Sequence, residues 1–233
     1  MGVQATAYPQ QALDFYKHYR DDLGKLDNGQ SHSNVYHWII TRNHATTVAN
    51  VPSTLKLVHE GQYDIASNSS GIRDTVTAYL RSIVPPFAVV DSARSVVDSL
   101  LHSGSFLFQY AVDGTYYVQL RHRNSLETWS RSGGEAFLAG EPFTYDFTSS
   151  LSQAYMNNLK QVDGVPERYA LISGDVNQDG IIDAGDLSEI DNASALFTSG
   201  YTSEDLNGDY LVDATDAQIA SNNAAEFRMV ERP

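Results

Sequence analysis

Apolar and polar residues alternate along the middle of the chain with the period of two that β-strands show. Between residues 54 and 148, short alternating stretches are separated by clusters of Ser, Asn, Gly and Pro. The strands predicted in this way cover residues 54–59, 74–81, 87–91, 104–110, 115–122, 125–130 and 143–148. Asp113-Gly114 indicates a hairpin-type turn before the strand at 115–122. This pattern predicts a mainly β fold built as an antiparallel β-sandwich.

The first 53 residues follow a different pattern. Apolar positions after Pro9 have helical spacing, and residues 34–41 and 46–51 show the pattern of strands. About fifty residues cannot readily form a core of their own. We therefore predict that residues 1–53 form an extension that docks on a neighbouring subunit, with packing on the sandwich of their own chain as the alternative.

Charge is concentrated at the other end of the chain. The sequence has 15 Lys and Arg against 29 Asp and Glu, a net charge of −14, and residues 167–233 hold fourteen of these acids and only three bases. The acidic balance argues against nucleic acid as a partner, and its density requires neutralising cations. With no Cys, disulfides and thiolate metal sites are excluded. The predicted boundaries are a sandwich at 54–148, a connector at 149–166 and a C-terminal module at 167–233.

The C-terminal module contains a twelve-residue pattern that recurs thirty residues later. Oxygen-bearing side chains stand at positions 1, 3, 5, 9 and 12 of both copies, the spacing of an EF-hand-like loop that wraps oxygens around Ca²⁺. Position 7 is apolar, as expected where a backbone carbonyl is the ligand and the side chain packs inward. The predicted ligands of two or more calcium ions are Asp175, Asn177, Asp179, Ile181, Asp183, Asp186, Asp205, Asn207, Asp209, Leu211, Asp213 and Asp216.

The two loops resemble the duplicated calcium-binding repeat of dockerins, in which Asp rather than Glu stands at position 12. The resemblance covers about residues 173–228, because Asn192, Ala195 and Phe197 also match Asn222, Ala225 and Phe227. It implies that each loop is followed by a short helix. It also implies that the two repeats pack as a pseudo-twofold pair through Ile190, Phe197, Ile219 and Phe227.

The repeat differs from the dockerin pattern at two places. Position 6 of the second loop is Tyr210, where the family has Gly for a positive φ, which predicts that the second site is the weaker one. Positions 10 and 11, which often carry a Ser-Thr-type pair for a cohesin partner, are Ala184-Gly185 and Ala214-Thr215.

The stretch before the repeat is similar to the immunoglobulin- or transthyretin-like sandwiches that precede dockerin-like repeats in secreted bacterial proteins. A Tyr-Tyr-Val strand runs into an Arg121-His122-Arg123-Asn124 corner and a Glu-Thr-Trp strand. We interpret the corner as structural, with its Arg residues paired to Glu127 or to the acidic module, rather than as a catalytic or ligand site.

No hydrolase, zinc-protease or phosphate-loop motif is present in the sequence. We therefore predict a non-enzymatic, calcium-binding structural protein, extracellular or at the cell surface. Its expected partners are other copies of itself, assembled head-to-tail into a filament or surface layer. The alternative is the C-terminal anchoring part of a secreted enzyme, whose dockerin-like module binds a cohesin-type protein. Neither hypothesis includes nucleic acid or a membrane span.

Overall fold

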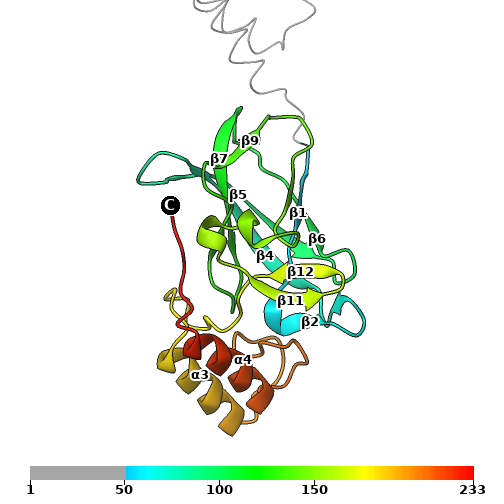
Figure 1. Ribbon diagram of the computed structural model, residues 1–233, viewed down its shortest axis with the longest axis vertical. Helices are drawn as coiled ribbons and strands as arrows, with labels where there is room; N and C mark the ends of the chain where they lie inside the picture. The colour runs from blue at the N-terminus through cyan, green and yellow to red at the C-terminus, as the bar shows by residue number, and fades with distance from the viewer. Residues whose placement is uncertain (1–50) are drawn as a thin grey trace, which may run out of the picture. The chain divides into compact units, whose positions relative to one another are not determined.

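The computed structural model describes residues 51–233 (Figure 1). The helix and strands predicted within residues 1–50, and with them nearly all of the predicted assembly segment, lie outside the described residues.

The larger sheet is built around the strand β4. It comprises β4 (Asp74–Ser82), β5 (Val89–Val97), β7 (Gly114–Arg121), β8 (Thr128–Trp129) and β9 (Glu135–Phe137). The order is β5-β4-β7-β8, with β9 also paired to β7, and all of these pairs are antiparallel. Alternate residues of β4 are buried, as its alternating sequence predicts, so one face of this sheet packs against the hydrophobic core.

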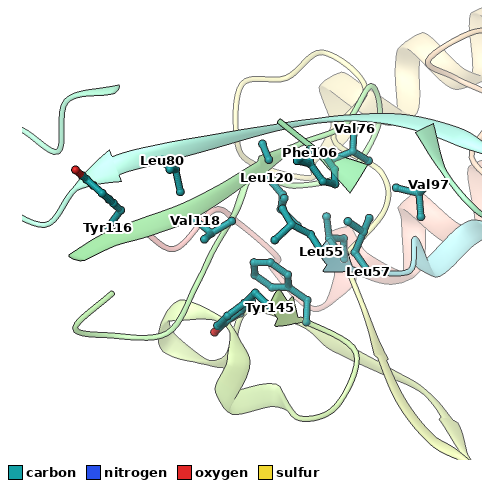
Figure 2. Close-up of a cluster of buried hydrophobic side chains, with 14 of the residues drawn as sticks. Leu55, Leu57, Val76, Leu80, Val97, Phe106, Tyr116, Val118, Leu120 and Tyr145 are labelled. Carbon is teal, nitrogen blue, oxygen red and sulfur yellow. The ribbon is translucent and has the colours of Figure 1, made fainter. Parts of the chain in front are cut away.

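A smaller sheet of three strands covers that face. Its order is β10-β1-β6, formed by β1 (Ser53–Lys56), β6 (Ser103–Phe106) and β10 (Thr144–Asp146). Leu55 and Phe106 from this sheet and Leu120 from the larger one are 0% exposed and belong to one hydrophobic cluster (Figure 2). The predicted mainly β sandwich is thus confirmed, although β1 and β10 run parallel rather than antiparallel.

The predicted hairpin at Asp113-Gly114 is wrong. The strands on either side of it, β6 and β7, belong to different sheets, so the chain crosses the sandwich here instead of reversing within one sheet. The Asp113 carboxylate accepts a hydrogen bond from the backbone N–H of Ala139 (2.8 Å), which holds this crossing against the residues that follow β9.

Short elements complete this part of the chain. They are η2 (Glu60–Gln62), β2 (Tyr63–Asp64), β3 (Ser69–Ser70), η3 (Leu151–Gln153), η4 (Tyr155–Asn157), β11 (Lys160–Gly164) and β12 (Glu167–Ala170). After β12, Leu171 pairs with His59 in a parallel bridge, so the end of this segment returns to its beginning. We call residues 51–172 the β-domain and residues 173–233 the C-terminal module.

The C-terminal module contains two helices of twelve residues, α3 (Ala184–Ala195) and α4 (Ala214–Ala225), which pack together (Figure 1). Each follows an Asp, Asp183 or Asp213, that caps the helix through a capping box. In the residues that the model describes, neither these helices nor any other is long and apolar enough to cross a membrane.

The predicted packing of the two repeats is half right. Ile190 is fully buried and Ile219 packs against the same cluster, but Phe197 and Phe227 are 84% and 83% exposed. Both Phe residues follow the ends of their helices with a positive φ of 52° and 55°. This turn at the helix end carries the two side chains away from the core between the helices.

Candidate calcium site

Two equivalent loops hold the predicted ligands. Loop 1 (residues 175–186) runs into α3 and loop 2 (residues 205–216) runs into α4. The last Asp of each loop organises the backbone. Asp186 accepts hydrogen bonds from the backbone N–H groups of Val176 (2.9 Å) and Asp183 (3.0 Å), and Asp216 makes the corresponding contacts in loop 2 at 2.7 and 3.0 Å. A short Asp side chain at position 12 therefore ties the start of the loop to the start of the helix.

The first Asp of each loop is buried beside the last. Asp175 is 2% exposed, and Asp186, Asp205 and Asp216 are each 0% exposed. Burial raises the pKa of Asp175 to about 6, and the negative charges of Asp186 and Asp179 act in the same direction. Burial likewise raises the pKa of Asp186, Asp205 and Asp216. Several buried carboxylates are thus held together at a cost that a divalent cation removes.

Positions 3 and 5 lie together at the rim of each loop. The backbone N–H of Asp179 donates to Asn177 Oδ1 (2.8 Å), and the side-chain amide of Asn177 donates to Asp179 Oδ2 (3.1 Å). Asn207 and Asp209 make the same two contacts in loop 2. These oxygens, like those of positions 1 and 12, are hard donors of the kind that calcium prefers. The residues present therefore fit calcium.

The structure places positions 7 and 9 differently from the other ligands. Asp183 and Asp213, at position 9, accept hydrogen bonds from the backbone N–H two residues later and cap the helices. At position 7, the side chains of Ile181 and Leu211 are each 44% exposed, so the prediction that they pack inward is wrong. The inward-facing residue is at position 8, where Ile182 and Val212 are each 1% exposed.

Backbone strain is shared between the loops. Tyr210 does adopt a positive φ, 70°, at position 6, where Gly180 has a φ of 91°. At position 4 the assignment is reversed, because Gln178 has a φ of 60° and Gly208 a φ of 78°. Each loop thus carries one glycine and one non-glycine in the left-handed region, where a non-glycine residue costs roughly 1 kcal/mol. The prediction of a weaker second site loses its basis in strain.

The Arg121–Asn124 corner joins the β-domain to both loops. Arg121 pairs with Glu127 (Nε to Oε2, 3.8 Å), as predicted. Arg123 donates to the backbone carbonyls of Thr202 and Asp205, the latter at 2.9 Å. The predicted pairing of the Arg residues with Glu127 and with the acidic module is found, although Arg123 meets backbone carbonyls of the module rather than its carboxylates.

Asn124 extends the same contact. Its side-chain amide donates to the backbone carbonyl of Asp205 (2.9 Å). The backbone carbonyl of Asn124 accepts from the N–H of Gly174 (2.7 Å), the residue before loop 1. The next residue, Ser125, bridges to Ser173. One short stretch of the β-domain therefore contacts the entry of both loops.

A buried carboxylate that the sequence did not reveal lies behind this corner. Asp74, the first residue of β4, accepts hydrogen bonds from Gln62 (2.8 Å), Arg123 (3.2 Å) and the hydroxyl of Tyr201, and lies 3.0 Å from His122 Nε2. Burial alone raises its pKa, but the hydrogen bond and charge of His122, the Tyr201 bond and the Arg123 charge together hold it well below the ordinary range. No sequence motif marks Asp74, because its partners come from distant segments.

Behind Asp74 runs a chain of buried hydrogen bonds that contains Asp, His and Ser. His122 Nε2 faces Asp74, and the Nδ1 atoms of both His122 and His59 lie 3.1 Å from the hydroxyl of Ser125. In the tautomer of His122 that carries its proton on Nε2, this N–H donates to Asp74 and Nδ1 is an acceptor. The Ser125 hydroxyl then donates to His122 Nδ1 and accepts from His59 Nδ1–H. Serine proteases use the opposite ring nitrogens, with the carboxylate on Nδ1 and the serine on Nε2. Ser125 is also 0% exposed, so no substrate reaches it.

One comparison with known proteins, the match to a family model, agrees with the loop geometry. Residues 173–224 match the family model of the dockerin type I domain, so this part of the chain is a dockerin type I domain preceded by a β-rich domain. Two solved structures, a C-terminal and an N-terminal interface mutant of a type II cohesin–X–dockerin complex from Acetivibrio cellulolyticus, are each 16% identical to this chain. Each alignment covers 76% of this chain and 99% of the other, with TM-scores of 0.41 and 0.38. No curated protein sequence matches the chain.

The dockerin match corrects the predicted partner. We expected other copies of this chain, joined into a filament or surface layer. A dockerin is one half of a pair whose other half is a cohesin, a different protein, so the match contradicts homopolymerisation. The filament hypothesis has no support among these similarities.

Proposed function

We propose that the dockerin type I domain at residues 173–224 binds two calcium ions and attaches this chain to a cohesin-type protein, outside the cell or at the cell surface. The observation that carries the proposal is the pair of loops, each with buried Asp residues at positions 1 and 12 and an oxygen-bearing rim. The family match supports the same reading. Bound calcium neutralises the negative charge of these carboxylates and so holds the module in the shape that a partner recognises.

The exposed aromatic residues of the module are candidates for contact with the partner. Phe197 and Phe227 occupy equivalent places in the two repeats and are more than four-fifths exposed. Burying a Phe side chain contributes roughly 1.5–3 kcal/mol. Each tenfold change in affinity corresponds to about 1.4 kcal/mol, so losing either contact weakens binding about tenfold or more.

The described part of the chain is proposed to have no catalytic role. Its Ser125–His122–Asp74 arrangement lies inside the structure, and the serine meets the wrong ring nitrogen for nucleophile activation. These hydrogen bonds instead support the corner that contacts the calcium loops.

Isothermal titration calorimetry against a panel of type I and type II cohesins tests the proposal. We expect at least one cohesin to bind in calcium and binding to vanish in excess chelator. Phe197→Ala and Phe227→Ala should weaken it, whereas Tyr110→Ala, at a residue 78% exposed in the β-domain, should not. Failure of every cohesin to bind the calcium-loaded chain would contradict the proposal, and equal effects of all three variants would refute the assigned surface.

A further inference from the structure

The two calcium loops differ in how their first residue is held. In loop 1, the side-chain amide of Gln178 donates to the backbone carbonyl of Asp175 at 2.5 Å. This contact closes the loop on itself and fixes the backbone from which the Asp175 carboxylate projects.

Loop 2 lacks this internal contact, because position 4 is Gly208. The carbonyl of Asp205, equivalent to that of Asp175, accepts instead from Asn124 Nδ2 and Arg123 Nη1, each at 2.9 Å. Both donors belong to the β-domain. They supply to loop 2 the contact that Gln178 supplies to loop 1.

The glycine at position 4 also lies against the β-domain. A Cβ on Gly208 would lie 2.9 Å from Cγ1 and 3.0 Å from Cδ1 of Ile72, a β-domain residue. The first of these distances is shorter than real Cβ contacts, so the Ile72 side chain would have to shift. Glycine at position 4 thus lets Ile72 pack closely against loop 2, while Arg123 and Asn124 hold the loop.

Arg123 and Asn124 are themselves rigidly placed. Arg123 donates to Asp74 through Nε (3.2 Å), and its guanidinium carbon lies 4.5 Å from the centre of the Tyr201 ring. Asn124 is 0% exposed, and its backbone carbonyl is bonded to Gly174. Donors fixed in this way lose little freedom when the loop binds an ion, the condition for preorganisation.

We propose that Arg123 and Asn124 are positioning residues of the second calcium site, so that the calcium affinity of loop 2, unlike that of loop 1, depends on the β-domain. This inference rests on the proposed calcium sites. It makes the β-domain part of the second site rather than a neighbour of it.

Charge and geometry act in opposite directions at Arg123. A guanidinium close to Asp205 repels a calcium ion, so removing its charge alone would tighten calcium binding. Removing its hydrogen bond to the Asp205 carbonyl loosens the loop and weakens binding. The inference requires the hydrogen bond to be the larger effect, so that Arg123→Gln weakens calcium binding in loop 2. Asn124 is neutral, so Asn124→Ala reports the hydrogen bond alone.

The test measures the two loops separately in the full chain. Asp175→Ala removes the first site, so that only loop 2 binds calcium, and Asp205→Ala leaves only loop 1 able to bind. Each of these two backgrounds then receives Asn124→Ala or Arg123→Gln. Gln178→Ala is the matched control. Calcium affinity is measured by calorimetry. Terbium luminescence excited through tyrosine adds a second readout for loop 2, which contains Tyr210, whereas residues 175–186 contain no aromatic residue.

We expect Asn124→Ala and Arg123→Gln to lower the affinity of loop 2 about five- to tenfold, the effect of one hydrogen bond of ordinary strength. The calcium affinity of loop 1 should change less than about twofold in these variants. Gln178→Ala should lower the affinity of loop 1 and leave that of loop 2 nearly unchanged. If Asn124→Ala does not fold, Arg123→Gln decides alone.

Equal losses in both loops mean a general structural role and overturn the inference, as do unchanged loops or a tighter loop 2 in Arg123→Gln. A parent chain that binds neither calcium nor terbium refutes the proposed function itself. A parent that binds both ions, with variants that do not discriminate between the loops, refutes only the inference.

Discussion

A single added methyl group at Gly61 should separate the β-domain from loop 2. In η2, a Cβ at this position would lie 2.4 Å from the carbonyl oxygen of Leu206, the second residue of loop 2. The carbonyl belongs to the backbone, so it cannot move aside as a flexible side chain does. Gly61 also donates its N–H to the hydroxyl of Ser173 (3.2 Å), so a second contact with the C-terminal module holds Gly61 in place.

Overpacking of this kind costs about 1–3 kcal/mol. A domain of 150–250 residues loses roughly 2–4 °C in melting temperature for each kcal/mol, so Gly61→Ala should lower the calcium-loaded melting temperature by about 2–12 °C. Because Leu206 adjoins Asp205, the same variant should also weaken calcium binding in loop 2.

Gly164→Ala is the matched control. A Cβ at Gly164 meets no atom within 4 Å, so this substitution should be neutral or slightly stabilising. Differential scanning calorimetry of both variants in saturating calcium makes the comparison. Equal melting temperatures for the two variants would show that the contact between Gly61 and loop 2 does not contribute to stability.

Three further predictions follow from the described contacts. Excess chelator should lower the melting temperature of the full chain, because each calcium ion at a thousandfold excess over Kd stabilises by about 4 kcal/mol; an unchanged calorimetric profile would contradict calcium binding. Asp74→Asn should lower the free energy of unfolding by about 3–5 kcal/mol, as expected for the loss of one partner of a buried ion pair. Asp113→Asn keeps an oxygen that accepts the Ala139 hydrogen bond, so it should lower the free energy of unfolding by less than about 0.5 kcal/mol. Urea unfolding measures both variants. Burial lowers the pKa of His59 and His122, so the folded state binds fewer protons than the unfolded state below about pH 6.5, and stability should fall as the pH drops from 7 to 5. A flat urea midpoint over this range in saturating calcium would refute the assignment of buried neutral imidazoles.

Features that depend on local sequence were predicted well. The alternation at 74–81 predicted β4, and the spacing of Asp and Asn predicted both loops. The resemblance to dockerins predicted the helix after each loop. These signals are local because a strand face and a twelve-residue loop are each decided by neighbours in the chain. The extent of β5 to Val97 and the short strands β9, β11 and β12 were missed, because their residues carry weak alternation and their pairing partners lie elsewhere in the chain.

Features that depend on distant segments were not predictable from one sequence. Asp74 accepts hydrogen bonds from Gln62, Arg123 and Tyr201, which are 12, 49 and 127 positions away. The sequence gives the charge of each group but not which groups meet. The prediction that Arg123 faces the acidic module was correct in its partner module, yet the contact is made to backbone carbonyls, which no residue pattern records.

The comparison of the two loops shows why their near identity in sequence is misleading. Tyr210 in place of glycine looks like a defect of loop 2 when position 6 is considered alone, yet loop 1 carries Gln178 in the same backbone region. The side chain of Gln178 also bonds the backbone carbonyl of the first residue of its own loop. Gly208 has no side chain to do so, and only its backbone N–H donates to the Asp205 carboxylate (2.8 Å). The backbone carbonyl of the first residue is therefore held in loop 1 by Gln178 of the same loop. In loop 2 it is held by Asn124 and Arg123, more than eighty positions before Asp205. The two loops repeat the ligands but not the contacts that hold the first residue. A dockerin domain cut free from the β-domain should therefore lose more calcium affinity in loop 2 than in loop 1.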